Sequence, residues 1–100
     1  MPAAMPAKHL VTKLRQLKPQ IQERYKAKQI ELFGSHIRGE QSATSDIDLL
    51  VDFEDGADLF DMIGLAIFLE DELQRKVDVV PKRALRAELR ETVLREAVPI

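Results

Sequence analysis

Apolar residues recur at helical spacing in the first quarter of the chain. The stripe keeps its phase across Pro19 and consists of Leu10, Leu14, Leu17, Ile21 and Tyr25. Spacings of three and four residues place these side chains on one face of a helix. We therefore expect one helix from about Lys8 to Tyr25, with a kink at Pro19, because proline lacks the backbone donor and crowds the preceding turn. Two separate short helices are the alternative, and residues 1–7 are expected to form a flexible tail.

Three short segments have the composition and alternation of β-strands: residues 29–33, 46–53 and 77–80. The first stops at a Gly34-Ser35 turn, and Pro81 closes the third. In the second, alternation separates an apolar side from a more polar side. Ile47, Leu49, Val51 and Phe53 form the apolar side, and Asp46, Asp48, Leu50 and Asp52 form the other.

Two further helices complete the predicted element order. Asp58 is a plausible cap for a helix over residues 58–74, which is apolar nearly all round and therefore hints at an assembly. A last helix is expected from about Arg83, after which Pro99 ends regular structure. Its stripe is Leu85, Leu89, Val93 and Ala97. The predicted fold class is α/β (α+β), in the order α-β-β-α-β-α, with a small mixed sheet and helices on its apolar face.

Length and charge narrow the class of protein. The 100 residues are the size of one ordinary domain, so residues 1–100 are expected to form a single domain. With 45% hydrophobic and 32% charged residues, the chain is typical of a globular protein rather than a disordered one. A net charge of −2 makes nucleic acid an unlikely partner, because counterion release requires clustered Lys and Arg.

Cysteine is absent, which excludes disulfides and thiolate metal sites. The longest apolar run, residues 62–69, is too short to span a bilayer. The first residues lack the charged start and apolar stretch of a secretory signal. We therefore expect a cytoplasmic protein with no membrane partner.

The candidate chemistry lies in acidic residues on the predicted strands. Asp46 and Asp48 share one strand face, with their backbones about 7 Å apart. If Asp78 lies on the neighbouring strand, it adds a third carboxylate. Clustered carboxylates repel one another and retain protons unless divalent cations neutralise them. Oxygen ligands of this kind suit Mg²⁺, which shares its coordination between carboxylates, water and phosphates.

The turn after residue 33 is the candidate phosphate-binding segment. Gly34 allows close approach of a phosphate, and Ser35 offers a hydroxyl and an amide donor. Arg38 and Gly39 continue this loop; Arg38 fits a phosphate contact and a surface ion pair equally well. Ser45 is a candidate substrate contact that more simply shapes the turn into the strand.

Each of these signals has a simpler explanation when taken alone. A Gly-Ser pair is usually only a turn, and an Asp-x-Asp pair is common on solvated strands. His36 is more often a solvated loop residue than a nucleotide contact. The acidic residues after the second strand are most simply a solvated face. The combination and its spacing are what favour a functional site.

Together these residues form a known pattern. Phe33-Gly34-Ser35, ten intervening residues and Asp46-Ile47-Asp48 resemble the signature of the nucleotidyltransferase (DNA polymerase beta-like) superfamily. The similarity extends over nearly the whole chain and includes residues 45–51, 76–80 and 95–100. By its length the chain resembles the minimal nucleotidyltransferase branch, whose members are the antitoxin partners of HEPN-domain toxins.

The resemblance implies specific roles for these residues. Asp46 and Asp48 would be metal ligands, and Asp78 would be the third carboxylate and the activator of the acceptor hydroxyl. Gly34 and Ser35 would cradle the triphosphate of ATP, with two Mg²⁺ ions as cofactor. Members of this branch neutralise their toxin by attaching AMP to one of its tyrosines, or by binding it.

Three functions follow from this resemblance. The first is a Mg²⁺-dependent enzyme that transfers AMP from ATP to a hydroxyl, a tyrosine, of a cognate HEPN toxin. The second is a non-catalytic antitoxin that neutralises its toxin by binding. The third is transfer to a small molecule of the aminoglycoside type, which ranks last because no extension is present to hold such an acceptor. Base preference and oligomeric state are left open.

Overall fold

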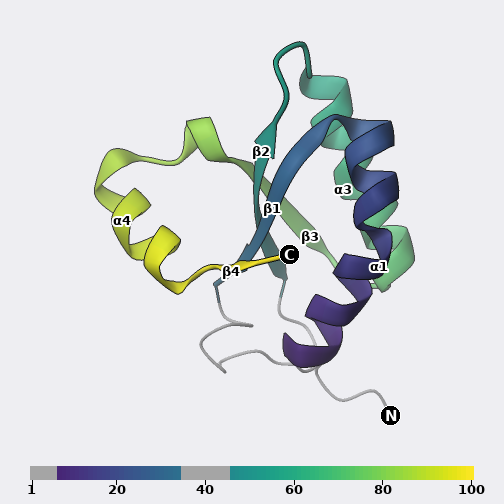
Figure 1. Ribbon diagram of the computed structural model, residues 1–100, viewed down its shortest axis with the longest axis horizontal. Coiled ribbons are helices and arrows are strands. Elements are labelled where there is room, and N and C mark those ends of the chain that lie inside the picture. The colour runs from purple at the N-terminus through teal and green to yellow at the C-terminus, as the bar shows by residue number, and fades with distance from the viewer. Residues whose placement is uncertain (1–6, 35–45) are drawn as a thin grey trace.

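The computed structural model describes residues 7–34 and 46–100 and contains helices, strands and one 3-10 turn (Figure 1). In chain order these are α1 (Ala7–Tyr25), β1 (Ala27–Phe33), β2 (Ile47–Phe53), α3 (Leu59–Leu73), β3 (Val77–Pro81), η1 (Lys82–Ala84), α4 (Ala87–Glu96) and β4 (Val98–Pro99). Residues 1–7 were expected to form a flexible tail, but Ala7 is the first residue of α1. Residues 1–6 lie outside the described part.

Helix α1 runs without interruption through Pro19, which confirms one helix rather than two. Its apolar stripe is buried, with Leu10, Leu14 and Ile21 fully inaccessible. Tyr25, at the end of the helix, is half-buried and packs against Phe68 of α3, with 5.5 Å between the ring centroids. The apolar periodicity thus predicted both the helix and the side it buries.

The strands form one mixed sheet in the order β3-β2-β1-β4. β1 is antiparallel to β2 and β4, whereas β2 and β3 are parallel, with Asp48 paired to Asp78 in the register. This confirms the predicted fold class, a mixed sheet with helices. It also shows that Asp48 and Asp78 occupy neighbouring strands.

Regular structure ends at Pro99, as expected, but the last element is a strand that the sequence did not predict. Val98 and Pro99 form an edge strand that pairs with Leu32 and Glu31, and the Ile100 amide donates to the Ile30 carbonyl at 2.9 Å. Proline is tolerated here because an edge strand needs only part of its backbone for pairing. A strand of two residues has no periodicity by which the sequence could reveal it.

The main core lies between the sheet and the helices α1 and α3. It contains the inward residues of β2, namely Ile47, Leu49 and Val51, together with the α3 residues Leu65, Leu69 and Leu73. Figure 1 shows α1 and α3 on one side of the sheet and α4 on the other. The predicted arrangement, with helices on the apolar face, therefore describes α1 and α3 but not α4.

Helix α3 matches its prediction closely. Asp58 is the N-cap, and its Oδ1 accepts the Asp61 amide at 3.0 Å while Asp61 Oδ2 accepts the Asp58 amide at 3.0 Å. This reciprocal capping box satisfies two backbone donors that the helix itself leaves free. Gln74, in the left-handed conformation at φ 53°, ends the helix. Across the described ranges, no helix is long and apolar enough to cross a membrane.

The last helix begins later than expected. Residues 82–84 form η1, and Arg86 is extended, with φ −62° and ψ 142°, so α4 starts at Ala87 rather than near Arg83. The Leu85 amide bonds to the Lys82 carbonyl at 3.2 Å, which closes the short turn before the chain extends. Leu85, the first residue of the predicted apolar stripe, therefore lies in an extended segment before the helix, whereas Leu89 and Val93 lie in the helix itself.

Candidate active site

Asp48 and Asp78 are adjacent carboxylates on one face of the sheet. Their neighbours Ile47 and Val77 point into the main core, so the two aspartates point to the opposite face. Both line a cavity of about 430 Å³ that also borders α4. The structure thus brings together two of the three carboxylates predicted from the sequence.

The cavity has an acidic wall and a more apolar wall. Phe33, Gly34 and Val80 complete the side formed by the strands. The opposite side is formed by residues from the end of η1 through α4, namely Leu85, Leu89, Thr92, Val93 and Glu96. In the sequence, the apolar members of this group belong to a predicted helix stripe, whereas Thr92 and Glu96 were not among the predicted site residues. Nothing in their spacing indicates a site, because the position of α4 depends on the path of the preceding segment.

Gly34 is placed directly against Asp48. Its φ is +84°, a conformation that side chains other than glycine rarely adopt. A Cβ at this position would collide with the carboxylate of Asp48. Glycine is therefore required both for the turn after β1 and for the space that the Asp48 side chain occupies.

Asp46 is exposed, precedes β2 and does not line this cavity. Within the residues that the structure describes, no group of three His, Cys, Asp or Glu side chains lies close enough to hold a metal ion. Of the three carboxylates that the sequence predicts to cluster, the structure thus places Asp48 and Asp78 together. Four other residues predicted to bind nucleotide lie outside the described ranges, and so does His36. The four are Ser35, Arg38, Gly39 and Ser45.

The Asp48 and Asp78 pair fits the chemistry of Mg²⁺. Neighbouring strands are about 4.8 Å apart, so two carboxylates on one face can share an ion. Mg²⁺ is commonly bound by one or two carboxylates, with water and substrate phosphates completing its octahedron. The missing side chain at Gly34 leaves room for the Asp48 carboxylate beside the end of β1. These donors therefore suit a magnesium ion that shares its ligands with a phosphate group.

Comparison with known proteins assigns the same region to one family. The family of nucleotidyltransferase domains matches residues 14–100. The chain is similar to the protein adenylyltransferase MntA of Thermococcus cleftensis, with 43% identity over 81 residues, which cover 81% of this chain and 82% of the relative. The match therefore includes the strands that carry Asp48 and Asp78.

Solved structures agree with the architecture. A minimal nucleotidyltransferase superposes with a TM-score of 0.82 at 42% identity, covering 96% of this chain and 97% of that chain. One chain from the complex of a tri-AMPylated Shewanella oneidensis HEPN toxin with an MNT antitoxin superposes with a TM-score of 0.57 at 27% identity, covering 93% of this chain and 66% of that chain.

Proposed function

The chain belongs to the nucleotidyltransferase family, and from that premise we propose that it transfers AMP from ATP to a tyrosine hydroxyl of a cognate HEPN toxin, and so acts as an antitoxin. The observation that carries this proposal is the Asp48 and Asp78 pair in a cavity bordered by Gly34. The similarity to a protein adenylyltransferase supports protein as the acceptor. The AMPylated toxin in the related complex supports a HEPN partner.

In this proposal Asp48 and Asp78, together with Asp46, would hold Mg²⁺. When bound, the metal supplies positive charge to the α-phosphate and the leaving pyrophosphate. Asp78 accepts the proton of the acceptor hydroxyl. The hydroxyl oxygen then forms a bond to the α-phosphorus while the bond from that phosphorus to the β-phosphate oxygen breaks, releasing pyrophosphate.

The remaining residues position the substrates. Gly34 and Ser35 cradle the triphosphate, and Arg38, Gly39 and Ser45 contribute further contacts from the same segment. Leu89 and Val93 give the cavity an apolar side against which an aromatic ring, either the base or the acceptor tyrosine, can pack. This wall comes from α4, so nucleotide and acceptor are held between the sheet and that helix.

A non-catalytic antitoxin is the second candidate. The observation that favours it is the position of Asp46, which does not lie with Asp48 and Asp78 in the cavity. A protein of this kind would protect against its toxin by contact alone. Replacement of both Asp48 and Asp78 by Asn would then leave protection unchanged.

The decisive experiment is the intact mass of the cognate HEPN toxin after incubation with this protein, ATP and Mg²⁺. We expect one or more AMP additions with the wild type. Loss of the proton acceptor in Asp78→Asn should slow transfer on the order of 10²–10⁴-fold, and we expect Asp48→Asn to be at least as impaired. Asp52→Asn is the matched control, because Asp52 points to the same face of β2 but lies outside the cavity.

Wild-type rates in a folded Asp48→Asn variant would refute the catalytic proposal. A stable complex with unmodified toxin would instead establish the binding antitoxin. Equal loss in Asp52→Asn would show that the effect is general to acidic residues of this strand rather than specific to the cavity.

A further inference from the structure

The outward face of α3 is apolar and uncovered. Leu59, Phe60, Ile63 and Ile67 are 60%, 82%, 45% and 61% exposed, and they account for four of the six large exposed apolar residues in the described ranges. Phe60, Ile63 and Ile67 follow one another at spacings of three and four, so they form a continuous stripe. The opposite side of the helix, with Leu65, Leu69 and Leu73, is buried in the core. Both sides of α3 are therefore built for apolar contact.

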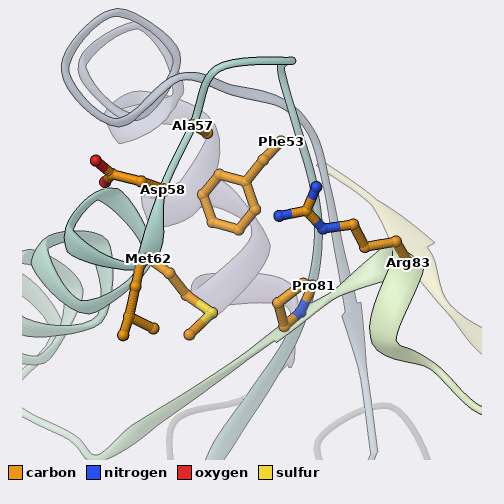
Figure 2. A pocket seen from close by; sticks show the side chains of 7 residues that line it. Phe53, Ala57, Asp58, Met62, Pro81 and Arg83 are labelled. Carbon is orange, nitrogen blue, oxygen red and sulfur yellow. The ribbon is translucent and has the colours of Figure 1, made fainter.

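A pocket adjoins this stripe at the start of α3 (Figure 2). Its volume is about 200 Å³, and its walls include Phe53, Leu59, Met62, Pro81 and Arg83. Leu59 lines the pocket and lies four residues before Ile63 of the stripe, so the pocket and the stripe adjoin. Small-molecule pockets are usually larger, roughly 300–1,000 Å³. A cavity of this size, continuous with an apolar stripe, instead fits one anchoring side chain of a protein partner.

The charges around the stripe indicate what kind of surface it meets. Helix α3 contains no Lys, Arg or His, and the exposed residues Asp58 and Asp71 flank the stripe at its two ends. Arg83 differs: its guanidinium lies toward the Phe53 ring in Figure 2, and it has no ion-pair partner in the described part of the chain. A guanidinium beside an apolar pocket can stack on an inserted aromatic ring. Arg24 of α1 also lies beside α3, 5.2 Å from the centroid of the Phe68 ring. The complementary surface is therefore apolar, with an aromatic or long aliphatic anchor, and has basic residues where it meets Asp58 and Asp71 at the two ends of the stripe.

A second copy of this chain does not fit that description. A two-fold axis across the stripe would place Asp58 of one copy near Asp71 of the other. An axis along the helix would place Asp58 near Asp58. In both arrangements like charges meet at the ends of the contact, which disfavours self-association. The acidic ends thus favour a partner of a different kind.

The stripe and pocket are also remote from the catalytic cavity. They lie on the α3 side of the sheet, whereas Asp48 and Asp78 face the α4 side. Phe53 and Pro81 end the same two strands that begin near Asp48 and Asp78, and the five residues from Asp48 to Phe53 span about 16 Å. A partner bound here would leave the cavity open to nucleotide.

We propose that the α3 stripe and this pocket form the docking surface for the HEPN toxin, separate from the cavity where AMP is transferred. This inference rests on the proposed function for the identity of the partner. The toxin contributes an apolar strip with one anchoring side chain for the pocket, and Lys or Arg residues opposite Asp58 and Asp71. The surface retains the toxin chain, while the acceptor hydroxyl reaches the cavity from a mobile segment or from another copy of the toxin.

The test measures toxin affinity by calorimetry and AMP transfer by intact mass for the same set of proteins. Phe60→Asp/Ile67→Glu should weaken binding on the order of 100-fold, because hot-spot residues dominate interface energy. It should leave Mg²⁺-dependent binding of a non-hydrolysable ATP analogue unchanged, which shows that the protein is folded. Asp71→Arg should weaken binding roughly 10-fold by charge reversal, although a positive charge at the end of α3 favours the helix itself.

Leu94→Glu is the matched control, because Leu94 is an exposed apolar residue of α4, 36% exposed, that does not line the cavity. Binding of the α3 double variant at wild-type affinity, or an equal loss in Leu94→Glu, would overturn the docking proposal and leave the transfer reaction standing. If the wild type binds the toxin but transfers no AMP, and the double variant does not bind, the docking proposal would be supported and the catalytic function refuted. A wild-type dimer that the double variant dissociates would assign the stripe to a second copy, and a wild type that does not bind the toxin would overturn both proposals.

Discussion

Gly34 and Asp48 are in closer contact than a residue with a side chain at position 34 would permit. The turn after β1 places Gly34 at φ +84° and its backbone against the Asp48 carboxylate. A methyl group would strain the turn and displace this carboxylate at the same time. The position therefore links the local conformation of one residue directly to the geometry of the acidic pair.

Gly34→Ala and Gly56→Ala separate these two effects. Gly56 has a similar φ of +93°, but a Cβ there would meet no atom within 4 Å. Both substitutions should lower the free energy of unfolding by roughly 1 kcal/mol, because alanine is strained at positive φ. Only Gly34→Ala should slow AMP transfer, on the order of 100-fold, through the misplaced carboxylate. Urea unfolding and the mass assay test this pair, and equal activities would argue against the contact.

Strand β4 has only two residues but a large structural role. β4 covers the outer edge of β1, and Ile100, only 8% exposed, continues from it into the main core. Lys18 of α1 donates to the Ile100 backbone oxygen at 2.7 Å. The end of β4 is thus joined to β1, to α1 and to the core, although the strand itself has two residues.

Ile100→Ala tests how much this element contributes. Removing a buried isoleucine side chain should lower the free energy of unfolding by about 2–4 kcal/mol, since it costs both transfer energy and a cavity. Ile67→Ala removes the same atoms from an exposed position and should stay within about 0.5 kcal/mol of the wild type. Denaturant midpoints compare the two variants. A loss below 1 kcal/mol in Ile100→Ala would show that this residue adds little to the core.

At the scale of the whole molecule, the sheet separates the two surfaces to which functions are proposed. The side with α1 and α3 contains the main core and supports the α3 stripe, while the side with α4 contains the Asp48 and Asp78 cavity. The same strand β2 therefore contributes Leu49 to the core and Asp48 to the cavity through simple alternation. Ligand binding at the cavity should stabilise the entire domain, because its walls come from β1, β2, β3 and α4.

Thermal unfolding measures this coupling. Mg²⁺ with a non-hydrolysable ATP analogue, at about 100 times the dissociation constant, should raise the Tm of the wild type on the order of 10 °C. The shift should be lost with EDTA and in Asp48→Asn/Asp78→Asn, and kept in Asp52→Asn. A full shift in the double variant would mean that nucleotide is held without these carboxylates.

Local patterns were sufficient to predict much of this arrangement. The helical stripe from Leu10 to Tyr25, the alternation through β2 and the Asp58 cap each depend on neighbours a few residues away, and each is confirmed. The shared face of Asp48 and Asp78 required one further assumption, that their strands are adjacent. The roles of Asp46, Ser35, Arg38, Gly39 and Ser45 remain predictions.

Other features depend on where distant segments meet, and local patterns contain no information about that. β4 is too short to show a period, and its pairing with β1 joins residues far apart in the chain. The stripe of α4 is consistent with either side of the sheet, and the extended Leu85 and Arg86 direct it over the acidic face. Periodicity and capping are set by short-range geometry, so the sequence alone determines them. The cavity wall and the uncovered face of α3 exist only once the whole chain is packed.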